Sequence, residues 1–226
     1  RLSFLRQFDA MIASSRRGAD EYASQGFPRD YLFVAHNSVS PAPTWQMSQR
    51  LETFNEQPCV LFVGRLQARK NVDLLLGACA EIQNVRLVIV GDGPEREALE
   101  ALAEEIYPSA EFVGARHGEE LKVYFAEADL FVLPGTGGLA VQEAMSHGLP
   151  VIVAQGDGTQ DDLVREENGW QIPPDEFEAL VAAMKDALSD AARLRRMGEE
   201  SYRIVKEEIN IGRMAETFVT ALNSLK

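Results

Sequence analysis

The chain has 226 residues, of which 46% are hydrophobic, and 22 Lys and Arg against 35 Asp and Glu give a formal net charge of −13. This composition is typical of a globular protein with a sizeable core. The negative charge argues against a nucleic-acid partner, because a protein that binds a phosphate backbone needs a cationic face. The two cysteines form neither a CxxC motif nor a Cys/His cluster, so we expect no zinc or redox centre.

No apolar run approaches the roughly 20 residues that a transmembrane helix needs, and no cleavable signal opens the chain. We therefore expect a cytoplasmic protein without a transmembrane segment. Peripheral association of a longer parent protein with the cytoplasmic face of a membrane stays open.

Short β-rich runs alternate with longer amphipathic segments along most of the chain. The predicted strands are 11–14, 31–35, 60–64, 86–90, 111–113, 130–133 and 150–153. The predicted helices between them are 16–25, 45–54, 70–82, 93–105, 117–127, 138–147 and 159–165. This order predicts an α/β fold, a Rossmann-like doubly wound parallel sheet with helices on both faces.

Two of the strand runs, Val60–Val63 and Leu87–Val90, are apolar at every position. Continuous apolar runs are typical of strands that are buried on both faces, so these two should be central strands. Beyond residue 173 the pattern is helical only, which predicts a helical C-terminal tail. Its first helix is expected to start at Pro173-Pro174-Asp175 and to carry an apolar stripe from Phe177 to Leu188, and two more helices are expected over about 190–208 and 211–224.

The loop after the first central strand begins with Gly64 and carries Arg65 and Lys70. In a doubly wound sheet, ligands bind outside the carboxyl ends of the strands. Two cations at a strand end and a helix start favour an anionic ligand there. Two solvated surface cations would give the same pattern.

A glycine-rich loop, Gly135-Thr136-Gly137-Gly138, runs into the helix predicted over 138–147. Backbone N–H groups at such a helix start can hold a diphosphate. One turn later, Glu143 places a carboxylate on a helix that must be largely buried, and such a group needs hydrogen-bond donors. A ribose diol would supply two donors, and a backbone or lysine partner would also satisfy the carboxylate.

Two further loops follow predicted strands. Gly91-Asp92-Gly93-Pro94 opens a helix, but Arg96 stands where a nicotinamide-binding Gly-x-Gly-x-x-Gly turn needs its third glycine, so we do not expect a dehydrogenase. The second loop, Gly114-Ala115-Arg116, has short side chains that suit the flat edge of a base. An ordinary turn explains that loop equally well.

Several of these segments together resemble one family in their order and spacing: Phe62–Leu66 with Lys70-Asn71, Val90–Pro94, Phe112–Gly114, Ala128–Pro134, and Glu143–Met145 with Gly148–Ile152. They look like the C-terminal donor-binding half of group 1, glycogen-synthase-like retaining glycosyltransferases of the GT-B fold. The resemblance is close over residues 58–190. It implies that residues 41–226 form a nucleotide-sugar-binding domain with closing helices, and that residues 1–40 are a remnant of the N-terminal domain and the crossover.

The resemblance also implies roles for individual residues. The catalytic pair Arg65 and Lys70 would bind the donor diphosphate and stabilise the departing nucleoside diphosphate, beside Gly64 and the N–H groups of Gly138 and Leu139. Glu143 would bind the ribose. The base would be lined by Ala115, Arg116 and Leu121, and the sugar pocket by Gly135, Thr136 and Gly137. No metal or cofactor would be needed, and the donor would be a UDP-, GDP- or ADP-sugar.

One position departs from the family pattern, because Gly135 stands eight residues before Glu143 where the family has a glutamate that approaches the sugar. The implied activity is retaining glycosyl transfer to a saccharide or lipid-linked acceptor, as in polysaccharide biosynthesis. Without the missing N-terminal domain, the fragment alone is expected to be inactive. Two alternatives stay open: a nucleotide-binding interaction module that has lost catalysis, and a GT-B nucleotide-sugar epimerase, against which the Gly64–Lys70 loop argues.

Overall fold

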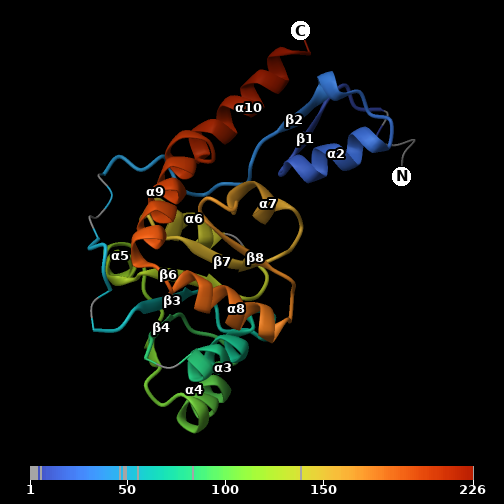
Figure 1. Ribbon diagram of the computed structural model, residues 1–226. Coiled ribbons are helices and arrows are strands. Elements are labelled where there is room, and N and C mark those ends of the chain that lie inside the picture. Colours follow the sequence, from blue (N-terminus) through green and yellow to red (C-terminus); the bar gives the residue numbers. More distant parts are fainter. Residues whose placement is uncertain are drawn as a thin grey trace.

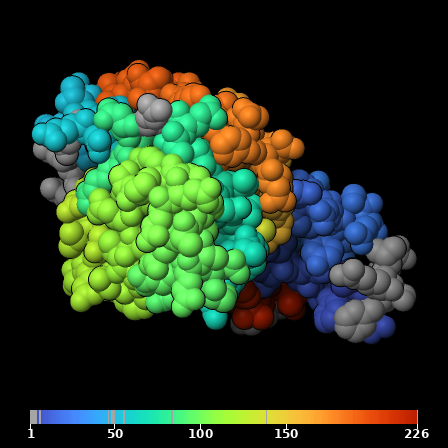
Figure 2. Space-filling model, turned by 90° about the horizontal axis from the view of Figure 1, so that it is seen from below, coloured from blue at the N-terminus to red at the C-terminus, as the bar shows by residue number. Residues whose placement is uncertain are grey.

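The computed structural model describes residues 5, 7–45, 47, 50–54, 56–82, 84–137 and 139–225. Within these residues lie a two-stranded and a six-stranded parallel sheet. In the small sheet, β1 (Met11–Ala13) pairs with β2 (Leu32–Val34), and α2 (Arg16–Ser24) and the 3-10 helix η1 (Arg29–Tyr31) lie between them in sequence. This N-terminal part, blue in Figures 1 and 2, forms a lobe at one end of the molecule.

The large sheet has the strand order β5-β4-β3-β6-β7-β8. Its strands are β3 (Cys59–Val63), β4 (Arg86–Val90), β5 (Glu111–Gly114), β6 (Leu130–Leu133), β7 (Val151–Ala154) and β8 (Gly169–Ile172). All neighbouring strands pair in parallel. The direction of winding reverses between β3 and β6, and the crevice at such a reversal is where doubly wound sheets bind their ligands.

Helices cover both faces of the large sheet. Their bounds are η2 (Ala68–Lys70), α3 (Val72–Ile82), α4 (Arg96–Ile106), α5 (Glu119–Glu127), α6 (Leu139–Ser146), α7 (Thr159–Leu163), α8 (Phe177–Ala187), α9 (Ala191–Glu207) and α10 (Ile211–Asn223). Helices α3 and α8 pack together on one face, and α6 and α9 pack together on the other (Figure 1). Helix α10 runs back to the lobe and contacts β1 and β2.

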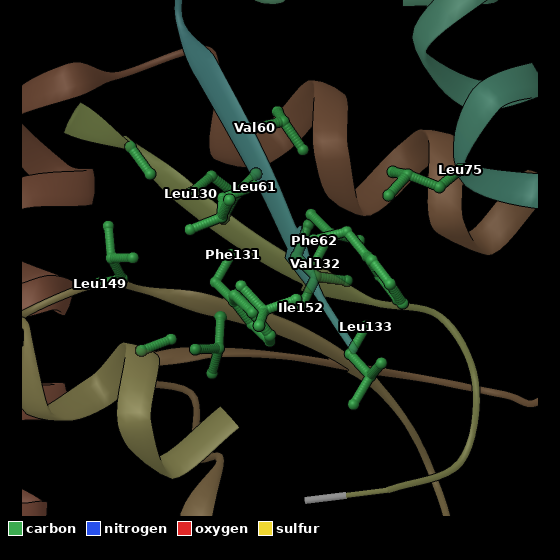
Figure 3. Packing of buried hydrophobic residues seen from close by; sticks show 14 of the residues in the cluster. Val60, Leu61, Phe62, Leu75, Leu130, Phe131, Val132, Leu133, Leu149 and Ile152 are labelled. Atoms are coloured by element: carbon green, nitrogen blue, oxygen red, sulfur yellow. The ribbon is translucent and has the colours of Figure 1, made fainter. Parts of the chain in front are cut away.

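The core lies along the middle strands of the large sheet, as the continuous apolar runs predict. Every residue of β3, β6 and β7 is buried. Side chains of β3 and β6, among them Phe62 and Phe131, pack with Leu75 of α3 and Leu149 (Figure 3). The predicted α/β class, the doubly wound sheet and the helical tail are confirmed.

The predicted helix over 45–54 is wrong, because its described residues form no helix. Arg50 instead donates hydrogen bonds of 2.7–3.2 Å to four carbonyl oxygens that follow or end α5 and α6, those of Phe125, Ala128, His147 and Gly148. The ring of Trp45 stacks on His147 with centroids 5.4 Å apart. These tertiary contacts hold the described residues of 45–54, which we name the strap, in an irregular conformation, although the apolar residues of the segment have helical spacing.

The sequence prediction also omitted β8 and placed the end of the helix beginning at residue 159 two residues too late, because α7 ends at Leu163. Strand β8 has the sequence Gly-Trp-Gln-Ile. Four residues that begin with glycine and show no alternation give almost no strand signal. Its pairing with the buried β7 stabilises the extended conformation, which its own sequence does not favour.

Buried polar residues fasten the lobe and the connecting segments to the large sheet. The amide oxygen of Gln142 in α6 accepts bonds from the Ser38 hydroxyl (3.0 Å) and the Val39 N–H (3.2 Å), and its amide nitrogen donates to the Ile209 carbonyl (2.8 Å). One side chain of α6 therefore holds both the segment that follows β2 and the connection between α9 and α10.

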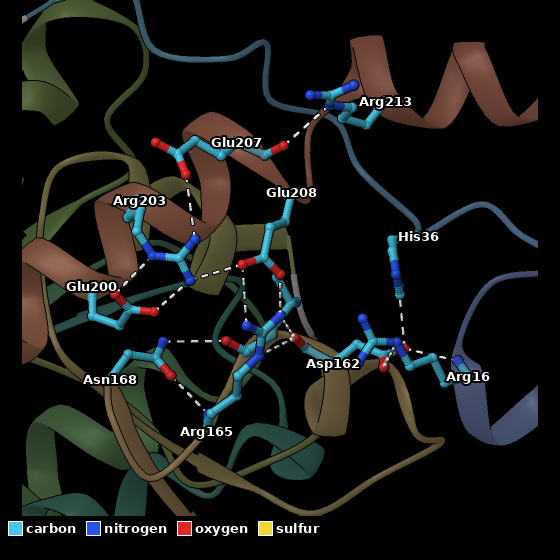
Figure 4. Close-up of polar contacts among 11 residues, drawn as sticks. Arg16, His36, Asp162, Arg165, Asn168, Glu200, Arg203, Glu207, Glu208 and Arg213 are labelled. Atoms are coloured by element: carbon cyan, nitrogen blue, oxygen red, sulfur yellow. Dashed lines mark hydrogen bonds and ion pairs between the residues drawn. The ribbon is translucent and has the colours of Figure 1, made fainter.

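A second polar cluster holds α7 (Figure 4). The Asp162 carboxylate accepts a bond of 2.8 Å from the backbone N–H of Arg16 at the start of α2 and lies 3.2 Å from Nδ1 of His36. Burial raises the pKa of Asp162, but these two partners outweigh it and lower the pKa below its usual value. On the other side of α7, Arg165 pairs with Glu208 at the end of α9 at 2.6 Å.

Candidate functional site

The loops at the carboxyl ends of β3 and β6 are in direct contact. Nζ of Lys70 donates a hydrogen bond of 2.6 Å to the carbonyl oxygen of Thr136. In return, the Thr136 N–H donates to the Arg69 carbonyl at 3.0 Å. Burial lowers the pKa of Lys70, and the neighbouring charge of Arg69 lowers it further. The fold thus brings together the cationic loop and the glycine-rich loop that the sequence singles out.

Two glycines allow this close contact. A Cβ atom at Gly135 would lie 2.2 Å from the Arg69 carbonyl oxygen and 2.5 Å from Cα of Lys70. Gly137 has φ of +134°, and a Cβ there would lie 2.3 Å from Nζ of Lys70. Only glycine fits both positions while the loop keeps this path. The absence of a side chain at position 135 is therefore part of how the loop closes on η2.

Arg65 differs from Lys70 in having no internal partner. It is exposed, and within the described part of the chain its guanidinium makes no hydrogen bond or ion pair. The backbone around it is fixed, because the Gly64 N–H donates to Val90 (3.0 Å) and the Leu66 N–H donates to Asp92 (2.9 Å). The structure therefore presents a free cation on a rigid support at the carboxyl end of β3.

Glu143 lies half-buried on α6, and burial raises the pKa of its carboxyl group, which the charges of His117 and Lys122 partly offset. Among the described residues, no group donates a hydrogen bond to that carboxylate. A half-buried carboxylate without donors is suited to accept hydrogen bonds from a ligand. Leu139 begins α6 and is exposed, whereas Gly138 falls outside the described residues.

The residues predicted for the base lie in and after the loop between β5 and α5. Ala115 is exposed, and the half-buried Arg116 donates a bond of 3.0 Å to the Ala115 carbonyl. Leu121 packs into the core and is 6% exposed, so it offers a ligand little surface. The charge of His117, in the same loop, acts to lower the pKa of Glu143.

A cavity of about 420 Å³, which we name the β6–β7 cleft, adjoins the glycine-rich loop. Its lining comes from the loop after β6, the loop and helix after β7, and the segment after β2: Thr136, Gly137, Leu139, Gly156, Asp157, Thr159, Gln160, Leu163 and Asn37. Thr136, Gly137 and Leu139 are among the site residues predicted from the sequence, whereas Asn37, Asp157 and Gln160 are not. The position of residues 155–160 directly after a predicted strand was the signal that could have identified the second wall.

The described residues include neither a cluster of metal ligands nor a helix that could span a membrane. No set of three or more His, Cys, Asp and Glu residues there is grouped to hold a metal ion. None of the helices described has both the length and the hydrophobicity that crossing a bilayer requires.

A second cavity, larger than the β6–β7 cleft at about 680 Å³, lies between β8 and α8, with Trp170 in its wall.

Comparison with known proteins gives consistent matches. Residues 43–204 match the family described as "Glycosyl transferases group 1". A GDP-mannose-dependent alpha-mannosyltransferase of Mycobacterium tuberculosis is 37% identical over 179 residues, which cover 76% of this chain and 46% of that protein. The chain thus spans less than half the length of this relative.

Solved structures share the fold. A sucrose-phosphate synthase from Thermosynechococcus elongatus superposes with a TM-score of 0.78 at 28% identity, covering 99% of this chain and 60% of the other. The Anabaena protein HepE, solved in complex with UDP, gives a TM-score of 0.79 at 18% identity, covering 99% and 66%. At that identity HepE supports the fold alone.

Proposed function

The chain belongs to the group 1 glycosyltransferases, and on this basis we propose that it binds the nucleoside-diphosphate sugar from which such an enzyme transfers a glycosyl group. The observation that carries the proposal is the contact of Lys70 with the glycine-rich loop at the β3–β6 crevice, on the same loop that carries the exposed Arg65. An unpaired guanidinium and an ammonium in that crevice are suited to a diphosphate.

We propose further roles for the other site residues. Glu143, without donors among the described residues, accepts hydrogen bonds from the ribose hydroxyls, and the Ala115-Arg116 loop contacts the base. The N–H groups at the start of α6, from Gly138 and Leu139, complete the phosphate site. Gly64, whose backbone is held to β4, lets the phosphates approach β3 closely.

The proposed reaction breaks the bond between the anomeric carbon and the diphosphate oxygen, and the electron pair leaves with that oxygen. An acceptor hydroxyl oxygen forms the new bond on the same face, and its proton passes to the departing diphosphate oxygen. Negative charge grows on the leaving diphosphate, so Arg65 and Lys70 stabilise the transition state more than the bound donor. Retention, like the saccharide or lipid-linked acceptor, is supported by the family resemblance.

We propose GDP as the nucleotide, because the relative that is 37% identical is named GDP-mannose-dependent. We further propose that residues 41–226 are the donor-binding domain, and that the acceptor is bound with the help of a preceding domain of which residues 1–40 are a part. The small sheet with its own helix, distinct from the large sheet, supports that division.

Calorimetric titration of the chain with GDP, UDP and ADP tests the proposal. Half of a two-domain cleft should bind its nucleotide with a Kd of about 10 μM to 1 mM, or about −4 to −7 kcal/mol. GDP should bind more tightly than UDP and ADP, and guanosine without phosphates should not bind detectably. Equal binding of guanosine and GDP would contradict a diphosphate site.

A nucleotide-binding module without catalysis is the second candidate, and the close packing of Gly135 favours it, because no carboxylate can project from this position. The two candidates differ in one assay. A longer protein that contains this chain should release GDP from GDP-mannose when an acceptor is supplied, whereas a module should bind the donor and release none.

A further inference from the structure

We propose that the β6–β7 cleft binds the transferred hexose of the donor, and that Asp157 and Asn37 recognise its hydroxyl groups. This inference rests on the proposed function and deepens it, because it assigns sugar recognition to the loop after β7 and the segment after β2. Neither segment was expected to contact the donor.

The cleft and the cationic site share one wall. Thr136 lines the cleft, and its carbonyl oxygen accepts the hydrogen bond from Lys70. The next carbonyl, that of Gly137, accepts a bond of 3.2 Å from Nε2 of Gln160 on the opposite wall. The cleft and the site of Lys70 therefore meet at Thr136, and a hexose attached to a diphosphate at Lys70 lies next to the cleft.

Asp157 offers a fixed and ionised acceptor. Its Oδ1 accepts bonds from the Thr159 N–H (3.1 Å) and the Thr159 hydroxyl (2.7 Å), which orient the carboxylate. The same bonds, the hydroxyl first, lower the pKa of Asp157, so the group is charged at neutral pH. Within the described residues nothing donates a hydrogen bond to its Oδ2, which leaves that oxygen for a ligand hydroxyl.

Asn37 supplies a second polar group from a different part of the chain. It is exposed, lines the cleft, and its amide makes no hydrogen bond with the residues that the structure describes. An amide can both donate and accept, and a sugar hydroxyl can do the same. Asp157 and Asn37 together therefore match a neutral ligand with several hydroxyl groups.

The cleft is already formed. Gln160 is buried, with 4% of its surface exposed, and it braces the two loops through its bond to Gly137. Gly156 packs against the Gln160 side chain, because a Cβ there would lie 2.9 Å from its Oε1. A preformed site loses less entropy on binding. The volume of about 420 Å³ is in the usual range of small-molecule sites.

The chemistry of the lining residues also favours a neutral sugar over an anionic ligand. The negative charge of Asp157 would repel a phosphate or carboxylate in the cleft, whereas a hexose is neutral. Leu139, which is 49% exposed, gives the cleft an apolar surface against which the C–H groups of a sugar ring can pack. A mixed polar and apolar lining of this kind suits carbohydrate.

Calorimetry with GDP and GDP-mannose, and with UDP and UDP-glucose, on the chain and on Asp157→Asn tests the inference. Asparagine keeps Oδ1 for Thr159 but replaces the free oxygen with an amide nitrogen. The hexosyl group should increase affinity over the bare nucleotide in the original chain, and Asp157→Asn should reduce that gain about tenfold while leaving GDP and UDP affinity unchanged. Asp161→Asn is the matched control, because Asp161 is exposed on α7 and does not line the cleft.

Each other outcome overturns a defined part of the account. Nucleotide binding with an unchanged sugar gain in Asp157→Asn, or with no sugar gain in the original chain, overturns the inference and leaves the diphosphate site intact. An equal loss for GDP and GDP-mannose assigns Asp157 to the nucleotide and also overturns it. If no nucleotide binds, the proposed function fails and the inference fails with it.

Discussion

The backbone of Gly135 lies against that of Arg69, so closely that a Cβ atom on Gly135 would be 2.2 Å from the Arg69 carbonyl oxygen. The next residue, Thr136, exchanges hydrogen bonds with Arg69 and Lys70. The loop after β6 therefore closes directly on the η2 helix. Glycine at position 135 is a condition of this contact, and a glutamate there would require another path for the loop.

Replacing Gly135 with glutamate, the residue of the family pattern, should lower the free energy of unfolding by about 1–3 kcal/mol, because the Cβ overlaps backbone that cannot move alone. Urea denaturation measures the loss. Gly18→Ala in α2 is the control, since its Cβ would have 3.3 Å to its nearest neighbour and should change stability by no more than about 1 kcal/mol. A Gly135→Glu variant as stable as the original chain would contradict the packing described.

Arg65→Ala should weaken GDP binding about 10- to 100-fold without changing stability, because the guanidinium has no described partner to lose. Lys70→Met should weaken binding similarly and also lower stability, because it removes the bond to Thr136. Calorimetry and thermal unfolding on the same samples separate the two effects. Lys185→Met, on the exposed face of α8, should leave GDP binding unchanged. Unaltered GDP affinity in Arg65→Ala would remove this residue from the site.

Arg50→Met should lower the free energy of unfolding by roughly 2–5 kcal/mol, since four carbonyl oxygens lose a charged donor. Burial lowers the pKa of Arg50 to about 10, and the charge stays in place at neutral pH. Urea titrations of this variant and of Arg213→Met, whose arginine is exposed on α10, give the comparison. Equal stability of the two variants would show that the contacts of Arg50 contribute little to the free energy of unfolding.

Acid should destabilise the protein partly through His147. Burial, and then the charges of Arg50 and Lys122, lower the pKa of His147 to about 4, while Glu119 acts in the opposite direction. In the unfolded chain the group titrates at its usual 6.5, so the unfolded state binds more protons between these values. The contribution of His147 to stability is therefore complete above pH 6.5 and is lost as the pH falls toward 4.

His147→Phe provides the measurement, because phenylalanine keeps the stacking on Phe125 and Trp45 without a titrating group. The free energy of unfolding should fall less between pH 7 and pH 4.5 in this variant than in the original chain. Acidic groups that stabilise the fold, such as Glu208 with its pKa lowered to about 2, titrate equally in both proteins. The same pH dependence in both would exclude His147 as a cause.

The large sheet was predictable because its strands carry their own signal. The apolar runs of β3 and β4 could only be buried strands, and the βα alternation fixed a parallel sheet. Strand β8 and the strap around Arg50 were not predictable, because each is determined by distant contacts, with β7 in one case and with α5 and α6 in the other. The local periodicity of hydrophobic residues does not indicate such distant contacts.

The candidate site, too, was only partly predictable from the sequence. Arg65, Lys70 and Glu143 stand out in the sequence because charged residues flank glycines or lie on an apolar helix. The bond from Lys70 to Thr136 and the approach of Gly135 to Arg69 join segments more than 60 residues apart in sequence, and only the strand order brings them together. Asn37 follows β2 and Asp157 follows β7, and in the sequence each is an ordinary loop residue.

The most direct test of the central claim is a map of the amide chemical-shift changes that GDP causes in the ¹⁵N-labelled chain. The largest chemical-shift changes are expected in Gly64–Asn71, after β3, and in Thr136–Ala140, at the start of α6. Arg65→Ala should reduce these changes. Changes concentrated around Trp170, at the larger cavity between β8 and α8, would place the nucleotide elsewhere and contradict the account.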